Sequence, residues 1–301
     1  MNQSALSFIT QWRDYLQMCK PRVVLLMLVT TYVGMHLAVP LVLVPWHIMV
    51  FGLLGIGLMA GSAAVINHII DARIDAIMAR TKLRPIPSGK ISTRNAFLFS
   101  VILGVTGFGL LVWKVNTLTA LLTLITLLGY AVIYTIFLKR STPQNIVLGG
   151  LAGAMPPMLG WTAVTGQLDA NSLLLVLIIF VWTPPHFWAL AIYRYNEYAK
   201  VKDIPMLPVT HGIPLTKTYI LIYTILLLVC SWLPFVVGMS GLTYVMGATI
   251  LGIIFLYYAI KLKRIDDPLI GRNMFRYSII YLLLLFVVMF VDHYVYYHVG
   301  V

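Results

Sequence analysis

Long runs of apolar residues, separated by shorter polar stretches, set the predicted architecture of this chain. The runs lie at residues 23–43, 47–70, 95–113, 117–138, 145–165, 172–193, 218–238, 242–260 and 278–297. Each has about the 20 residues that a helix needs to cross a bilayer. Helices are expected because lipid cannot hydrogen-bond free backbone groups, and the alternating pattern of a membrane barrel is missing. The sequence predicts an all-α integral membrane protein, with nine transmembrane helices in a single bundle and residues 1–301 as one polytopic domain.

The charged residues lie between the apolar runs and predict how the chain crosses the membrane. The sequence is 60% hydrophobic and 10% charged, whereas soluble domains carry about 25% charged residues. With the N-terminus in the cytoplasm, 20 of the 21 Lys and Arg residues fall in cytoplasmic segments, and Lys114 alone falls outside. Because cytoplasmic loops are enriched in Lys and Arg, we expect a cytoplasmic N-terminus and a C-terminus outside.

The net charge of +12 does not require a nucleic acid partner. Basic loops beside anionic lipid explain most of this charge, and we find no DNA- or RNA-binding motif. Residues 1–20 are expected to form a cytoplasmic interfacial segment. One apolar face of a helix in this segment would carry Leu6, Ile9, Trp12 and Leu16.

The long polar segments are all predicted on the cytoplasmic side. They lie at residues 71–94, 194–217 and 261–277. The two cysteines are far apart in sequence and predict neither a disulfide nor a zinc site. We therefore expect cytoplasmic active-site loops at residues 71–94 and 194–217.

Asn67, Asp71 and Asp75 follow the second apolar run at a spacing of four residues. If the helix continues, the three side chains share one stripe. Two carboxylates about 6 Å apart would repel by about 3 kcal/mol at an effective dielectric constant of about 20. A divalent cation between the two carboxylates would turn this repulsion into a net attraction. Mg²⁺ typically binds one or two carboxylates together with substrate phosphates. The spacing fits a metal–diphosphate site, and solvated acids at a helix end remain the alternative.

Arg80 and Arg84 supply positive charge directly after the paired acids. Guanidinium groups bind phosphate oxygens in a fixed geometry. Both arginines would also be ordinary members of a basic cytoplasmic loop. Pro85 is expected to end any helix here, because the residue before a proline resists helical geometry.

A second polar cluster extends from Arg194 to Gly212 and contains Glu197, Lys200 and Asp203. Glu197 and Asp203 are six residues apart and would lie on different faces of a helix. They converge only if the chain breaks between them. The cluster therefore predicts either a second cation site or an amphipathic interfacial loop.

His186 lies within the predicted span 172–193, directly after Pro184 and Pro185. The two prolines remove amide donors and should kink the helix. An ionisable group inside a span indicates function, although such a histidine also serves as a hydrogen-bond partner of a broken helix. The run "GGLAGAMPPMLGW", residues 149–161, carries small residues that allow helices to approach closely.

The combination of these stretches resembles one family. The pattern N-x-x-x-D-x-x-x-D at residues 67–75, followed by "RTKLRPIPSG" at residues 80–89, is similar to the first signature of the UbiA-type intramembrane prenyltransferases. "CKPRVV", "TPPHFWALAIYRY" and "PMLPVTHG" resemble the members of that family that act on haem B. The resemblance implies a nine-helix, Mg²⁺-dependent enzyme of a bacterial inner membrane that transfers farnesyl from farnesyl diphosphate to a haem B vinyl group. Water would complete the product haem O, which a terminal oxidase would receive, with contact to that oxidase or its assembly.

The resemblance also implies roles for individual residues. Asp71 and Asp75, helped by Asn67, would hold Mg²⁺. The residues that would offset charge on the departing diphosphate are Arg80, Arg84, Lys139 and Arg140. The candidates for the haem propionates are Lys20, Arg22 and Arg194, and His186 could touch iron, a vinyl group or a propionate.

The number of metal ions, the acceptor and the class of protein stay open on the residues alone. Many family members carry a second D-x-x-x-D, and Glu197, Lys200 and Asp203 do not complete it here, so Asp203 as a further metal ligand and a single-metal site both remain. The acceptor could instead be an aromatic quinone precursor. A transporter would place acids mid-span, whereas most acids here fall at the predicted cytoplasmic edge.

Overall fold

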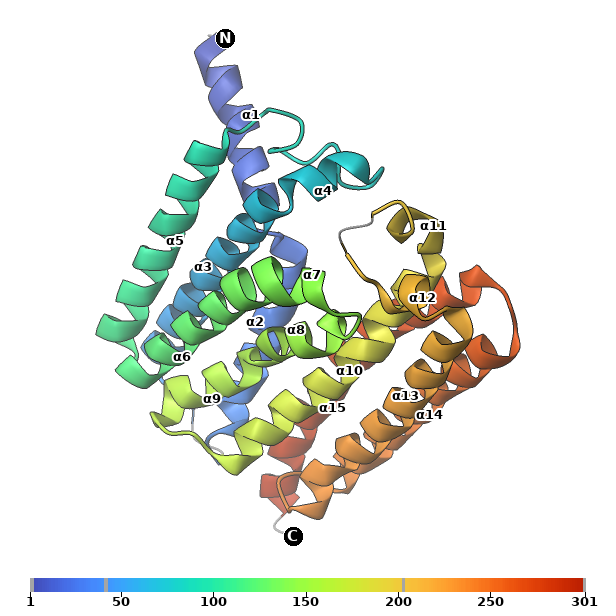
Figure 1. Ribbon diagram of the computed structural model, residues 1–301. Coiled ribbons are helices and arrows are strands. Elements are labelled where there is room, and N and C mark those ends of the chain that lie inside the picture. The colour runs from blue at the N-terminus through green and yellow to red at the C-terminus, as the bar shows by residue number, and fades with distance from the viewer. Residues whose placement is uncertain (1–2, 41–42, 202–203, 300–301) are drawn as a thin grey trace.

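The computed structural model describes residues 3–40, 43–201 and 204–299, and within these ranges the chain is helical with no strand. The helices form a bundle, with the two ends of the chain at opposite ends of it (Figure 1). The helices are α1 Gln3–Met18, α2 Pro21–Leu37, α3 Trp46–Ile70, α4 Ala72–Ile77, α5 Thr93–Lys114, α6 Thr117–Leu128, the π-helix η1 Gly129–Leu138, α7 Lys139–Ser141, α8 Asn145–Ala154, α9 Pro156–Thr165, α10 Ala170–Tyr193, α11 Tyr195–Tyr198, α12 Leu207–Thr210, α13 Ile213–Val236, α14 Leu242–Arg264 and α15 Pro268–Val299.

Eight helical stretches of the described residues are long and apolar enough to cross a membrane. A ninth would be the pair α1 and α2, which are bent by 50° at the break between them. The chain is thus a multi-pass membrane protein, and the count of nine spans and the direction of the termini stay predictions. The predicted run 23–43 is wrong in its bounds, because α2 ends at Leu37. Pro40 follows closely, and the residue before a proline resists helical geometry.

The predicted cytoplasmic loop 261–277 is also wrong. Helix α14 continues to Arg264 and α15 begins at Pro268, so residues 265–267 alone connect them. Lys and Arg in the last turn of a helix interact favourably with its dipole, and proline fits the first helical position. Most of the polar residues of this segment therefore belong to the ends of the two helices and not to a loop.

Two predicted spans are irregular. The run 117–138 becomes α6 and the π-helix η1. The run 145–165 becomes α8 and α9, which are interrupted at Met155 before two consecutive prolines. The prolines of α10 behave differently, because Pro184 and Pro185 lie inside one uninterrupted helix.

Close packing of α2 on α9 depends on glycine. A Cβ atom on Gly160 would lie 2.0 Å from the carbonyl oxygen of Thr31, and one on Gly34 would lie 2.1 Å from that of Pro157. The backbones of the two helices therefore touch, as the small residues of the run 149–161 predicted.

Candidate active site

The first motif lies where α3 ends and α4 begins. The predicted continuous helix is interrupted at Asp71, which lies between the two helices. The backbone N–H of Asp71 still donates to the Asn67 carbonyl at 3.0 Å, and that of Asp75 to the Asp71 carbonyl at 2.8 Å. These bonds keep the helical spacing of the three side chains. All three residues are buried, each with 4% of its surface exposed.

Basic groups from distant segments meet the two acids. Lys139 Nζ lies 2.5 Å from Asp71 Oδ2, and the Arg84 guanidinium lies 2.6 Å from Asp75 Oδ2. Asn67 connects the cluster, since its amide donates to Asp71 Oδ2 at 2.9 Å and its oxygen accepts from Lys20 Nζ at 2.7 Å. Each acid is therefore paired with a cation. An anionic ligand bound here could replace the acids as the partner of these cations.

The donor set fits a divalent cation shared with a ligand. Asp71 Oδ1 is buried and has no hydrogen-bond partner among the described atoms, so one carboxylate oxygen remains available. Among the described residues there is no group of three or more His, Cys, Asp or Glu residues that could hold a metal. A cation here would depend on two carboxylates, the Asn67 amide and oxygens of the substrate, as Mg²⁺ does with phosphates. The predicted ligand Asp203 lies outside the described residues.

Lys20 reaches this cluster from an unusual backbone position. It lies in the turn before α2 with φ 52° and ψ 58°, a left-handed conformation that is rare for residues other than glycine. Burial lowers the pKa of its ammonium group to about 8, and repulsion from Arg84 and Lys139 adds to this effect. A left-handed backbone at a residue other than glycine indicates that the position of the ammonium group matters.

We expect Lys20→Gly and Lys20→Met to differ in stability but to share a defect in activity. Glycine removes the left-handed backbone cost of about 1 kcal/mol, so Lys20→Gly should be about that much more stable than Lys20→Met. Both changes remove a charged donor, which should weaken diphosphate binding about tenfold or more. Thermal unfolding and inhibition by pyrophosphate measure the two effects. Wild-type pyrophosphate affinity in Lys20→Gly would show that the ammonium group does not contact the ligand.

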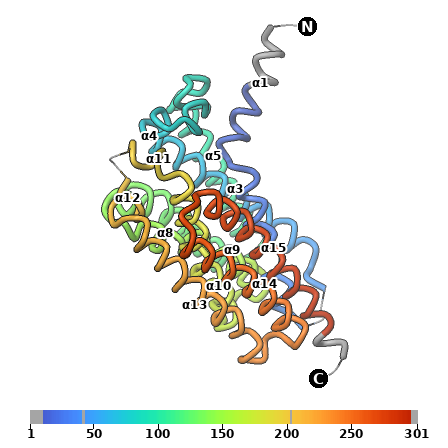
Figure 2. The backbone as a smooth tube through the Cα atoms, turned by 90° about the vertical axis from the view of Figure 1, so that its right-hand side faces the viewer, coloured from blue at the N-terminus to red at the C-terminus, as the bar shows by residue number. Residues whose placement is uncertain are grey.

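The second polar cluster lies near the first without joining it. Glu197 Oε1 accepts from the Arg194 guanidinium at 3.0 Å. Burial raises the pKa of the Tyr198 hydroxyl in α11. The positive charges of Arg80 and Arg194 partly offset this increase. Helices α4 and α11 lie beside each other in both views (Figures 1 and 2). No described contact joins Glu197 to the paired acids.

Three further predicted residues, Arg140, Lys200 and Arg22, are exposed. Arg140 follows Lys139 directly but lies on another face of the helix, so only Lys139 meets Asp71. None of the three forms an ion pair with a carboxylate among the described residues. They are free to bind an anion from outside the bundle.

His186 is buried between α10 and α15. Its Nδ1 lies 2.6 Å from the hydroxyl oxygen of Ser278. Its ring stacks on Trp182 and Phe275, with centroid distances of 4.2 and 4.6 Å. The histidine thus has a packing role, and any role toward a substrate is additional to it.

Two polar residues at these sites escaped the sequence analysis. His68 is buried, and neither ring nitrogen has a hydrogen-bond partner among the described atoms; its position directly after Asn67 was the available signal. Arg272 lies with its guanidinium 5.8 Å from the ring centre of Tyr193, beside Arg194 at 6.0 Å. Arg272 was assigned to a loop, and only the true start of α15 places it against α10.

The geometry defines a buried site at the end of α3 in which carboxylates and cations could bind a diphosphate, and comparison with known proteins agrees with this class. Residues 27–283 match the model of the UbiA prenyltransferase family. The chain belongs to this family.

More specific similarity comes from bacterial relatives named protoheme IX farnesyltransferase. The relative from Legionella pneumophila strain Paris is 63% identical over 283 residues, covering 94% of this chain and 96% of its own. The relative from Shewanella denitrificans is 61% identical over 290 residues, covering 96% of both chains.

Solved structures share the fold at low identity. A structure described as a digeranylgeranylglyceryl phosphate synthase is 19% identical, with a TM-score of 0.78 over 95% of this chain and 99% of the other. A UbiA homologue from Archaeoglobus fulgidus bound to GPP and Mg²⁺ is 15% identical, with a TM-score of 0.64 over 92% and 99%.

Proposed function

We propose that this protein transfers the farnesyl group of farnesyl diphosphate to a vinyl group of haem B, with addition of water, giving haem O and diphosphate. The observation that carries the proposal is 63% identity, over 94% of the chain, to a relative named protoheme IX farnesyltransferase. The paired acids and their cations support the diphosphate side of the reaction. The quinone-precursor alternative shares only the first motif, and the transporter alternative has no comparable relative among those described above.

Asp71, Asp75 and Asn67 would hold Mg²⁺, which supplies positive charge to the leaving diphosphate when bound. Lys139, Arg84 and Lys20 are within reach of the same oxygens and would exchange their carboxylate or amide partners for phosphate oxygens. The bond between farnesyl C1 and the diphosphate oxygen breaks, and the electron pair leaves with the diphosphate. Fixed cations in a buried site stabilise that charge without the reorganisation that water would need.

The allylic cation then meets the haem. A vinyl carbon forms the new bond to farnesyl C1, and water adds to the vinyl carbon next to the ring and loses a proton. Burial of the acids limits the water that could capture the cation early. We assign the propionates to basic groups near the α10 end, with Arg194 as the predicted partner and Arg272 beside it.

The test is a mass measurement on extracted haem. Membranes containing the protein receive haem B and farnesyl diphosphate, with Mg²⁺ or with EDTA. We expect a haem species heavier by one farnesyl group plus water, formed with Mg²⁺ and lost with EDTA. Folded protein that releases diphosphate with aromatic acceptors but yields no such haem would overturn the haem assignment in favour of a quinone precursor. If no prenyl donor releases diphosphate, the transferase proposal fails as a whole.

His186→Ala is expected to impair haem use more than farnesyl diphosphate use. The change removes two aromatic stacking contacts and one hydrogen bond beside the proposed acceptor side, and leaves the paired acids untouched. The measurement is the KM for each substrate. Ser278→Ala is the matched control, since it removes the hydrogen bond and keeps the imidazole. Equal defects in the two variants, or equal effects on both substrates, would show that His186 has a structural role alone.

We place the protein in a bacterial cytoplasmic membrane, with the end of the bundle that carries α4 and α11 facing the cytoplasm. The support is the distribution of Lys and Arg, which follows the positive-inside rule. Haem O formed at this site would pass to a terminal oxidase or to its assembly.

A further inference from the structure

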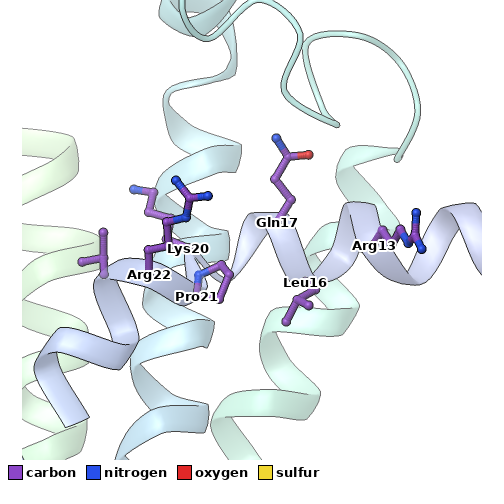
Figure 3. Close-up of a pocket in the computed structure, with 7 residues that line it drawn as sticks. Arg13, Leu16, Gln17, Lys20, Pro21 and Arg22 are labelled. Atoms are coloured by element: carbon purple, nitrogen blue, oxygen red, sulfur yellow. The ribbon is translucent and has the colours of Figure 1, made fainter. Parts of the chain in front are cut away.

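Two cavities meet where α1 turns into α2, at residues 19–20, called the elbow below. One has a volume of about 510 Å³ and a basic lining that includes Arg13, Lys20 and Arg22 (Figure 3). The second, about 870 Å³, continues as an apolar groove between α1, α2, α3 and α5. Leu16 and Pro21 line both cavities, so the two form one continuous amphipathic surface.

The basic half carries cations that no carboxylate neutralises, although Lys20 donates to Asn67 and Arg13 lies 5.9 Å from the ring centre of Trp12. Arg13 and Arg22 are exposed, and neither forms an ion pair with a carboxylate among the described residues. In Figure 3 the side chains of Gln17, Lys20 and Arg22 point to the same side of the elbow, and Leu16 points to the other. An anionic head group could therefore meet several donors at once, with apolar surface directly below it.

The apolar half is an open, shallow groove. Its walls include Trp12, Leu25 and Leu98, which are 48%, 63% and 50% exposed. Gly57 and Gly61 of α3 also line it, and their missing side chains widen it. The volume falls in the range of about 300–1,000 Å³ that proteins use to hold small ligands.

The site shares one residue, Lys20, with the reaction centre. None of Asp71, Asp75, Arg84 and Lys139 lines either cavity, and Lys20 is the link between them through its bond to Asn67. A ligand with one anionic end and one long apolar end fits this surface by charge and by polarity. The proposed cytoplasmic leaflet is rich in such molecules, because its lipids carry negative head groups.

We propose that the elbow binds one anionic glycerophospholipid, with its head group on Gln17 and Arg22, Arg13 adding positive charge further along α1, and one acyl chain in the groove along Trp12 and Leu16. The lipid holds the elbow and thereby the left-handed turn that aims Lys20 at the active site. Lipid binding itself does not require transferase activity, although the site shares Lys20 with the reaction centre.

Trp12 provides a direct probe, because it lines the groove. The full-length protein is titrated in micelles with phosphatidylglycerol or phosphatidylcholine that carries brominated acyl chains, which quench nearby tryptophan. Each titration is compared with the same lipid without bromine, and the Trp12 signal is the difference between wild type and Trp12→Phe. A basic residue near a lipid head group strengthens binding about fivefold. We therefore expect tighter binding of phosphatidylglycerol, by a factor of about 25 for two arginines.

Two double variants, each of which removes two positive charges, test whether the lipid binds at the elbow. Arg13→Gln with Arg22→Gln should lose the preference for phosphatidylglycerol, whereas Lys263→Gln with Arg264→Gln, at the far basic end of α14, should keep it. Equal quenching by the two lipids in the wild type would overturn the proposal, as would a preference that survives in Arg13→Gln with Arg22→Gln. Displacement of brominated phosphatidylglycerol from Trp12 by haem B would assign the groove to the acceptor and would also overturn it.

Discussion

Asp71→Asn and Asp75→Asn are each expected to lower kcat/KM for farnesyl transfer by about 10³-fold, because each removes a negative ligand from the proposed Mg²⁺ site. Loss of one electrostatic contact to a reacting group costs about 10²–10³-fold in known enzymes, and here the loss also weakens the metal. Asparagine keeps the shape of aspartate and an oxygen that can accept from Lys139 or Arg84, so the variants should remain in the membrane. Product mass and diphosphate release measure the effect.

Asp266→Asn is the matched control for these variants. Asp266 pairs with Lys217 at 2.5 Å, but its side chain is exposed in the short connection between α14 and α15. The Lys217 partner lowers the pKa of the Asp266 carboxyl, so this acid is charged at neutral pH. Its replacement should leave turnover close to the wild-type value. Full activity of Asp71→Asn or Asp75→Asn at limiting Mg²⁺ would remove the metal role of that residue.

Gly160→Ala should destabilise the fold more than any surface change, by about 3 kcal/mol, which is the upper end of the usual cost of overpacking. The added methyl group would occupy the position 2.0 Å from the Thr31 carbonyl oxygen. That atom belongs to the backbone of α2, so relief requires the two helices to separate. The readout is the temperature at which the detergent-extracted protein loses its monodisperse form. Gly34→Ala should behave alike, since its methyl group would lie 2.1 Å from the Pro157 carbonyl oxygen at the same interface between α2 and α9.

Gly153→Ala is the control for helix chemistry without overpacking. Gly153 also lies in a helix, in α8, but a Cβ atom there would have no neighbour within 4 Å. Alanine favours a helix over glycine by up to about 1 kcal/mol, so this variant should be as stable as the wild type or slightly more stable. Wild-type stability in Gly160→Ala would show that α2 and α9 do not touch through their backbones.

The paired-acid site was predicted in part from the local spacing of its residues. The spacing of Asn67, Asp71 and Asp75 predicted their common face, and the face survives although the helix breaks at Asp71, because hydrogen bonds four residues apart continue through the break. The pattern did not reveal that both acids would be neutralised by protein cations. Lys139 lies 68 residues from Asp71 in the chain, and neighbouring Arg140 was an equal candidate until the rotation of α7 was known.

The sequence by itself determined the helical membrane class, the approximate spans and the identity of the paired acids. Hydropathy over about 20 residues and a four-residue spacing are local properties, and they keep their meaning in any tertiary arrangement. Only the tertiary structure decided which cations meet which acids, where α15 begins, how α2 touches α9, and that the elbow at residues 19–20 carries a groove. These features depend on how each helix is rotated and tilted against its neighbours. Lipid is equally apolar on every side and does not specify that rotation, so contacts between helices must do so.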